Sequence, residues 1–291
     1  MNEHSVLRIT IKNLGYAIIM AGIIAMSVAM INGGWSGTVV STSVYFSALM
    51  IATLLSRFQP YYEHWQQPQQ DTVTDWLHLL ISTSVASGVF QLLAVESHLF
   101  RNHFSIVVWP NHWPWYIQLP VLATLAEFGG YWSHRAMHTF NWLNRVHTIH
   151  HSAKRLYPLN ATRNHPIDVL ITLICTLTPL MMLGVSEENL SLLSSFLIAH
   201  LVLQHANLEF DLGVFERWLN LCKLHKWHHL PDMEKQRANF GNVLLVWDHV
   251  FGTYRDFNQN AEDALAIDLG THQNMATDYV SQLTYPFEIQ K

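Results

Sequence analysis

Three short histidine motifs dominate the chemistry that this sequence can perform. In an α-helix, side chains at positions i, i+3 and i+4 lie on nearly one face, so each motif brings its imidazoles together. Neutral imidazole binds iron, copper, nickel and zinc. The spacing therefore predicts three helical groups of metal ligands. They are, in chain order, His134-Arg-Ala-Met-His138, His147-Thr-Ile-His150-His151 and His225-Lys-Trp-His228-His229.

The number of these histidines indicates more than one metal ion. Zinc sites take about four ligands, and catalytic ones about three from the protein, so eight imidazoles exceed what one ion needs. Two adjacent metals accommodate them. Nineteen histidines stand against sixteen Lys plus Arg in the whole chain. Seven outside the motifs are interpreted as hydrogen-bonded packing residues: His4, His64, His78, His98, His103, His112 and His272.

Long apolar segments must position these motifs. Only 13% of the residues are charged, about half the usual share of a soluble domain. Four apolar runs are long enough to cross ~30 Å of hydrocarbon as helices. Two shorter ones, the first containing Pro179, could form a tight hairpin or a re-entrant element. The runs are Leu14–Asn32, Val39–Leu55, Trp76–Val95, Trp113–Trp132, Ile167–Gly184 and Leu190–Gln204.

The predicted fold is therefore all-α, a polytopic membrane bundle of four to six segments with a cytoplasmic helical cap that holds a di-metal site. The first run exceeds the ~7–15 apolar residues of a signal peptide, so we expect it to be retained. Loops are expected at Gln59–Gln70 and Phe100–Pro114. If the runs pair as hairpins, only Arg101 among the basic residues lies opposite the motifs, which places the motifs on the cytoplasmic side.

Several other classes of protein find no support. The net charge is −5 and the basic residues form no stripe, so nucleic acid is not an expected partner. Cys175 and Cys222 belong to no CxxC pair, which gives no sign of a thiolate site. A membrane zinc hydrolase should carry HExxH, which is absent. A metal transporter or sensor should carry its histidines within the spans, whereas these eight lie just outside them.

The order of the motifs resembles the fatty acid hydroxylase / sterol desaturase superfamily. Arg163-Asn-His165-Pro166 stands between the second and third motifs, and Asn239-Phe-Gly-Asn-Val-Leu-Leu-Val-Trp247-Asp248-His-Val-Phe-Gly252-Thr253 follows the third. The resemblance covers about Leu122–Asp256. It implies a catalytic domain at 122–257. The apolar runs before it, which carry no such resemblance, predict N-terminal membrane helices at 1–121, and residues 258–291 are expected to form a cytoplasmic C-terminal tail.

The resemblance also implies the metal, the reaction and further site residues. It implies two iron ions, with zinc as a substitute in purified protein, and a ninth ligand, His205, with His200 as a further candidate. Glu127 lies in an otherwise uncharged run, where an ionisable group indicates function. Two interpretations stay open at this point: it orients a ligand histidine, or it is a residue at the membrane interface. The other supporting candidates are Arg163, His165, Asn207 and Asp248.

The expected activity is hydroxylation of a fatty acyl, sterol-like or isoprenoid lipid with dioxygen. Unactivated C–H bonds resist acid–base attack, so a metal centre must supply the oxidant. The chain has no GxGxxG fingerprint and no His-Pro-Gly-Gly stretch, so electrons are expected from a separate ferredoxin or b-type cytochrome with its reductase. Desaturation is the alternative within the superfamily, and a non-enzymatic membrane metal-binding or transport protein is the alternative outside it.

Overall fold

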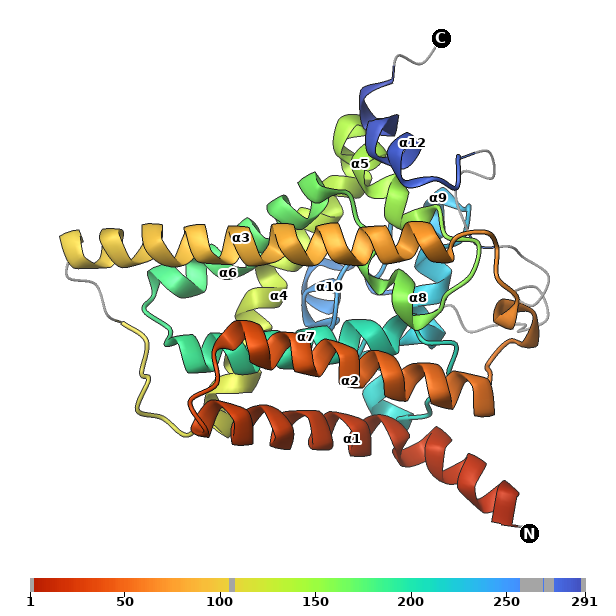
Figure 1. Ribbon diagram of the computed structural model, residues 1–291, viewed down its shortest axis with the longest axis horizontal. Coiled ribbons are helices and arrows are strands. Elements are labelled where there is room, and N and C mark those ends of the chain that lie inside the picture. Colours follow the sequence, from red (N-terminus) through yellow and green to blue (C-terminus); the bar gives the residue numbers. More distant parts are fainter. Residues whose placement is uncertain (1–2, 105–107, 257–268, 270–274, 289–291) are drawn as a thin grey trace.

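Four long helices form the first half of the chain and run alternately in opposite directions (Figure 1). The computed structural model describes residues 3–104, 108–256, 269 and 275–288. The start of α1 and the loop after α2 lie at one end of the molecule, while α4 runs obliquely to the other three helices and leads to α5. The α1–α2 turn, the end of α3 and the start of α4 share the other end. The bounds are α1 Glu3–Asn32, α2 Gly37–Phe58, α3 Thr72–Phe104 and α4 Trp115–Thr139.

Three of these helices are long and apolar enough to cross a membrane, counting only the described residues: Ser5–Asn32, Gly37–Phe58 and Thr72–Phe100. The fourth predicted run is helical too, but α4 buries polar residues such as Gln118 and Glu127 along one side, which lowers its hydropathy. The expected loop at Phe100–Pro114 is wrong in its first part, because α3 continues to Phe104. The apolar run therefore extends into a longer helix than predicted.

The second half of the chain wraps the end of the bundle where the histidine motifs lie. Its longer helices are α5 Asn141–His151, α6 Pro166–Met182 and α7 Glu187–His205. The shorter elements are η1 Glu63–Gln66 in the first half, then η2 Pro158–Thr162, η3 Gly213–Arg217, α8 Cys222–His228, α9 Met233–Gln236, α10 Val246–Phe251, α12 Tyr279–Thr284 and η4 Tyr285–Phe287.

Helices α6 and α7 form a hairpin that reaches the opposite end of the bundle. Its turn meets the segment before α4: the Trp109 N–H donates to the Leu183 carbonyl at 3.0 Å, and the Asn111 amide donates to the Gly184 carbonyl at 2.7 Å. A short turn thus joins the two apolar helices, which pack on different neighbours, α6 on α3 and α4, and α7 on α1 and α2. The choice between a tight hairpin and a re-entrant element stays a prediction.

Close packing between α4 and α6 sets the position of the first histidine motif. A Cβ atom on Gly129 would lie 2.0 Å from the Cys175 carbonyl oxygen, so only glycine permits this approach. Leu122, Ala126 and Leu180 bury the adjoining interface. A second apolar cluster joins α1, α2 and α7.

The described part of the C-terminal region packs on both halves of the chain. Helix α12 contacts α3, and η4 contacts α5. Arg145 donates to the Tyr285 carbonyl at 2.7 Å, and a 2.8 Å hydrogen bond joins His78 to Gln282. Residues 275–288 thus form part of the folded body, while the predicted domain boundaries stay a prediction.

Candidate metal centre

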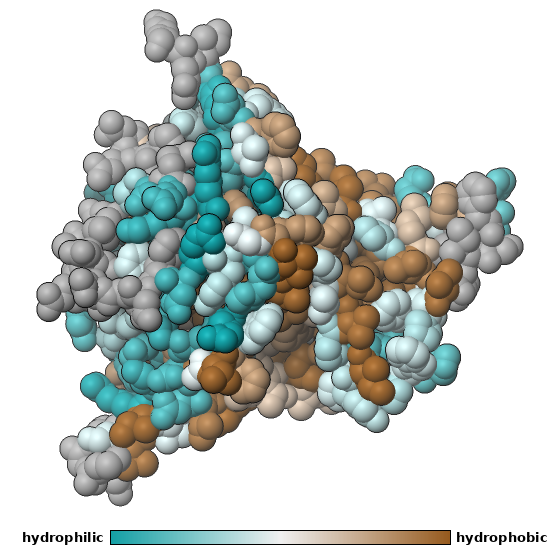
Figure 2. All heavy atoms as spheres, turned by 180° about the vertical axis from the view of Figure 1, so that it is seen from behind, coloured by the Kyte–Doolittle hydropathy of each residue, from teal (hydrophilic) through white to brown (hydrophobic). Residues whose placement is uncertain are grey.

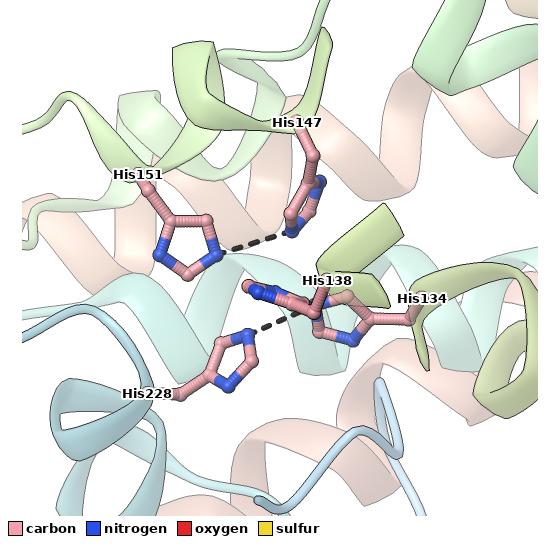
Figure 3. Close-up of side chains that lie close together, drawn as sticks. All are labelled: His134, His138, His147, His151 and His228. Atoms are coloured by element: carbon pink, nitrogen blue, oxygen red, sulfur yellow. Dashed lines mark hydrogen bonds between the residues drawn. The ribbon is translucent and has the colours of Figure 1, made fainter. Parts of the chain in front are cut away.

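Nine buried histidines converge in two adjacent groups, and they are the eight motif histidines together with His205. Within each group the ligand nitrogens lie within 4.8 Å of one another. The five-histidine group, shown in Figure 3, draws on α4, α5 and α8 and comprises His134, His138, His147, His151 and His228. The four-histidine group comprises His150, His205, His225 and His229.

Each HxxHH motif divides its histidines between the two groups. From the second motif, His147 and His151 enter the five-histidine group, while His150 enters the other. From the third motif, only His228 enters the five-histidine group, while His225 and His229 enter the other. Along a helix, position i+4 is turned by about 40° one way from position i, and position i+3 by about 60° the other way. The expectation of one shared face was too coarse, since this difference separates the ligands of two sites.

The hydrogen bonds of the five-histidine group call for a cation. His134 donates from Nδ1 to the Phe240 carbonyl at 2.7 Å, and His228 donates from Nδ1 to the Ala238 carbonyl at 3.1 Å. A carbonyl only accepts, so both Nε2 atoms carry lone pairs, and they lie 2.9 Å apart. Burial, then the neighbouring His134, lowers the pKa of His228 well below its usual value, so no proton relieves this contact. A metal ion between the nitrogens would.

The hydrogen bonds of the four-histidine group also leave two imidazole lone pairs facing each other. His150 donates from Nδ1 to the Arg163 carbonyl at 3.3 Å, and His205 donates from Nδ1 to the Leu201 carbonyl at 2.9 Å. Their Nε2 lone pairs then face each other at 3.3 Å. Burial, then His229, lowers the pKa of His150 well below its usual value. This group fits a second cation.

The donor set and its dimensions suit two transition-metal ions. Metal–imidazole bonds of about 2.0–2.1 Å place ligand nitrogens up to about 4 Å apart, close to the spread observed here. An all-imidazole set selects iron, copper, nickel or zinc over magnesium or calcium. The rings of His151 and His229 stack at a centroid distance of 4.6 Å, so the two groups share a wall.

Asp168 supports the five-histidine group, and the sequence analysis missed it. Its Oδ2 accepts from His147 Nδ1 at 2.7 Å, and both side chains are only 6% exposed. A carboxylate in this position fixes the ring orientation and raises the basicity of the opposite nitrogen. The signal was present, because Asp168 is the one charged residue in the run Ile167–Gly184. Like Glu127, Asp168 is an ionisable residue in an apolar run, which indicates a functional role.

Glu127 does not contact a histidine, contrary to the first of its two interpretations. It accepts from the backbone N–H groups of Asn242 and Val243 at 2.9 and 3.0 Å. Asp248 accepts from the N–H groups of Phe240 and Gly241, both at 2.8 Å. The two carboxylates therefore hold the segment whose Phe240 carbonyl receives the His134 ring, one step further from the metal groups.

The Arg163 carbonyl orients His150, and the Arg163 guanidinium forms a buried ion pair with Asp75. His165 caps the start of α6: its Nδ1 accepts from the Ile167 N–H, and its Nε2 lies 3.2 Å from the Leu283 carbonyl. Arg163 thus connects the four-histidine group to α3, whereas His165 contacts the C-terminal region, and neither residue belongs to the two groups.

Asn207 and His200 lie outside both groups. The Asn207 amide bonds the backbone N–H and carbonyl of Tyr62, both at 2.8 Å. His200 has both ring nitrogens engaged, with the Tyr16 hydroxyl at 2.8 Å and the Asn220 carbonyl at 3.1 Å.

The histidines interpreted as packing residues also stay outside the metal groups where the structure describes them. His78 is buried and hydrogen-bonded, as predicted. The other described ones are exposed surface residues and not core residues: His64, His98, His103 and His112. His272 and the side chain of His4 lie outside the described residues.

Comparison with known proteins relates this geometry to a family. Residues 119–253 match the family model described as Fatty acid hydroxylase. The ornithine lipid hydroxylase OlsE of Rhizobium tropici is 30% identical over 254 residues, which cover 84% of this chain and 74% of that protein. Alkylglycerol monooxygenase of Danio rerio is 27% identical, over 75% of this chain and 50% of its own length.

A third relative is the very-long-chain aldehyde decarbonylase GL1-8 of Oryza sativa subsp. indica, which is 25% identical over 61% of this chain and 63% of that protein. The chain thus spans about half the length of the Danio rerio monooxygenase and more of the other two. No solved structure gives a significant match.

Proposed function

The chain belongs to the fatty acid hydroxylase family, and from this premise we propose that it is a membrane-bound di-iron oxygenase that hydroxylates a lipid. The observation that carries the proposal is the convergence of nine buried imidazoles in adjacent groups of five and four. Two adjacent metal sites, separated only by stacked histidine rings, suit a reaction that brings dioxygen and a C–H bond together.

Iron supplies, when bound, the oxidation of an unactivated C–H bond by dioxygen, which no side chain can perform. The chain's own residues hold that iron in a fixed geometry. The carbonyls of Phe240, Ala238, Arg163 and Leu201 fix ring tautomers, so that Nε2 lone pairs face the metal positions. Asp168 does the same for His147 with a full negative charge.

The balance of the reaction defines what else must bind. Hydroxylation converts one C–H bond, one dioxygen, two electrons and two protons into one C–OH group and one water. The histidines are closed-shell ligands and cannot supply those electrons. A separate ferredoxin or b-type cytochrome with its reductase is therefore the proposed donor.

We propose six membrane segments, α1 to α4 and the α6–α7 hairpin, with the histidine groups on the cytoplasmic side. Three helices meet the length and hydropathy of a span. The α6–α7 turn bonds the segment before α4 at the end of the bundle opposite the histidines. The basic residues support the cytoplasmic side through the positive-inside bias. Residues 122–257 would form the catalytic domain.

The proposed substrate is a polar lipid with an acyl chain. OlsE is named as an ornithine lipid hydroxylase, and it matches most of this chain. An amino-acid-containing acyl lipid is therefore the first substrate to test. Such a lipid can keep its chain in the bilayer while its reactive carbon reaches the histidine groups.

The test combines product and metal. The purified protein in lipid nanodiscs is loaded with ferrous iron and given ferredoxin, its reductase, a native lipid extract and oxygen-18 dioxygen. The proposal predicts a lipid that gains one labelled oxygen atom. A product that loses two hydrogens without label would show the desaturase alternative. Tightly bound metal with neither product would favour the metal-binding or transport alternative.

A further inference from the structure

Helix α4 turns its apolar stripe away from the protein. Ile117, Val121, Leu125, Phe128 and Trp132 are 39–45% exposed, and their spacing of three or four residues places them on one face. The opposite face buries Glu127, His134 and His138. A helix of a water-soluble protein buries its apolar face and exposes its polar one. The reversed arrangement means that the outer face of α4 meets a non-aqueous environment.

Helix α10 extends this stripe with residues from beyond the third histidine motif. The Trp247 ring lies 4.8 Å from that of Phe128, and the Phe251 ring lies 5.1 Å from that of Trp132. Trp247 also donates from Nε1 to the Thr124 carbonyl at 2.9 Å. Next to these rings, Val250 is 61% exposed. Two helices far apart in sequence thus form one apolar surface.

The surroundings of this surface indicate a bilayer and not a protein partner. A docking patch is bounded and rimmed by polar residues. Here the apolar surface continues onto Leu170 and Ile174 of α6, which packs against α4. Figure 2, the view from behind, shows apolar atoms through the middle and right of this face, beside a hydrophilic region on its left. In Figure 1, α10 lies behind the three long helices and within their length, not beyond their ends.

We propose that α10 is embedded in the lipid bilayer. Trp247, beside Phe128, lies deeper among the acyl chains. Phe251, beside Trp132, lies one turn nearer the cytoplasmic headgroup layer, with Val250 next to it among the outer part of the acyl chains. The inference rests on the proposed membrane placement and adds to it. Part of the predicted cytoplasmic cap then lies in the membrane and not above it.

This placement connects the lipid to the metal centre. Asp248 belongs to α10 and accepts from the Phe240 N–H, while the Phe240 carbonyl receives the ring of His134. The bilayer that holds α10 therefore also steadies the segment on which the five-histidine group rests. Lipid contact positions a ligand through two hydrogen bonds.

Spin labels in nanodiscs test the proposal. Cys175 and Cys222 are replaced by alanine, and single cysteines are placed at Val250 on α10, at Glu234 on α9 and at Met50 on α2. For each label, the measured quantity is the ratio of its collision rate with oxygen to its collision rate with a water-soluble nickel complex. This ratio should be several-fold higher for V250C than for the exposed label at E234C. M50C reports on a candidate span, because Met50 is 60% exposed on α2.

The outcomes separate this inference from the membrane placement. If M50C meets oxygen but V250C meets nickel as E234C does, α10 lies in water and the inference is overturned. If V250C meets neither, protein covers it, which also overturns the inference. If M50C itself meets nickel, the membrane placement fails first and takes the inference with it.

Hydroxyl-radical footprinting of the unaltered chain provides a second measurement that needs no cysteine variant. Val250 and Phe287 are 61% and 60% exposed in the structure. Each modification rate is divided by the rate of the same residue in the unfolded chain. In nanodiscs, Val250 should be protected several-fold relative to Phe287. Equal protection of the two would contradict a lipid-embedded α10.

Discussion

Replacing Asp168 tests how the protein holds its metal. Asp168→Asn keeps the shape of the side chain and an oxygen that can accept from His147, but it removes the negative charge. Asp168→Ala removes the acceptor as well. Because the contact is 2.7 Å long and both side chains are buried, solvent does not screen it. We expect both variants to bind metal more weakly, and the alanine variant to be weaker than the asparagine variant.

The size of the effect follows from the contact. A buried hydrogen bond to a charged group contributes roughly 1.5–3 kcal/mol. At about 1.4 kcal/mol for each factor of ten, this corresponds to a loss of about 10- to 100-fold in affinity. Residues that orient metal ligands typically have effects of the same size. Asp168→Asn should lie near the lower end and Asp168→Ala near the upper end.

The assay is competition for ferrous iron against a chelator of known affinity, under anaerobic conditions. A double-mutant cycle with His147→Ala adds specificity, because residues that act through one contact are not additive. In the His147→Ala background, Asp168→Asn should weaken binding no further. Undiminished affinity in Asp168→Ala, or full additivity with His147→Ala, would refute the assigned role.

Three further predictions concern ligands, pH and packing. His228→Ala should abolish lipid oxidation and lower the metal content. The control His200→Gln, at a buried histidine outside both groups, should leave the metal content unchanged. Inductively coupled plasma mass spectrometry measures the metal content of both variants. Burial lowers the pKa of several histidines below the usual 6.5, so the unfolded chain binds more protons than the folded one as the pH falls. Below about pH 6.5 the metal-free protein should therefore lose up to about 1.4 kcal/mol of stability per pH unit for each such histidine. An unfolding midpoint that does not change with pH would contradict this. These histidines are His150, His151, His225, His228 and His229. Gly129→Ala places a Cβ atom against the Cys175 carbonyl and should destabilise the fold by about 1–3 kcal/mol. In the control Gly88→Ala, the added Cβ atom would have no heavy atom of another part of the chain within 4 Å, so the fold should not be destabilised. Thermal unfolding in detergent compares the two variants.

The sequence indicated which histidines would lie together because histidine spacing along a helix is a local property; that they bind metal stays a prediction. The helices that carry His134, His147 and His225 are where the motifs placed them. Which ligands share a metal is a tertiary property, so the division of each HxxHH motif between two groups was not predicted. It depends on how α5 and α8 face each other across the centre.

The supporting residues show the same limit. Asp168 and Glu127 are each the one charged residue in an apolar run, and this pattern indicates a functional role for both. The contacts that tell them apart come from helix packing: α6 brings Asp168 to His147, while α4 turns Glu127 toward the backbone of Asn242. The outer stripe of α4 was likewise hidden, since Gln118 and Glu127 interrupt the hydropathy without interrupting the apolar face.

The number of iron ions per chain tests the central claim most directly. Iron-loaded protein, freed of loose metal on a desalting column, should hold two ions per chain. The double variant His147→Ala/His151→Ala, which depletes the five-histidine group, and His225→Ala/His229→Ala, which depletes the four-histidine group, should each retain one. A single ion in the unaltered chain, or two ions retained in either variant, would contradict the assignment of nine histidines to two metal sites.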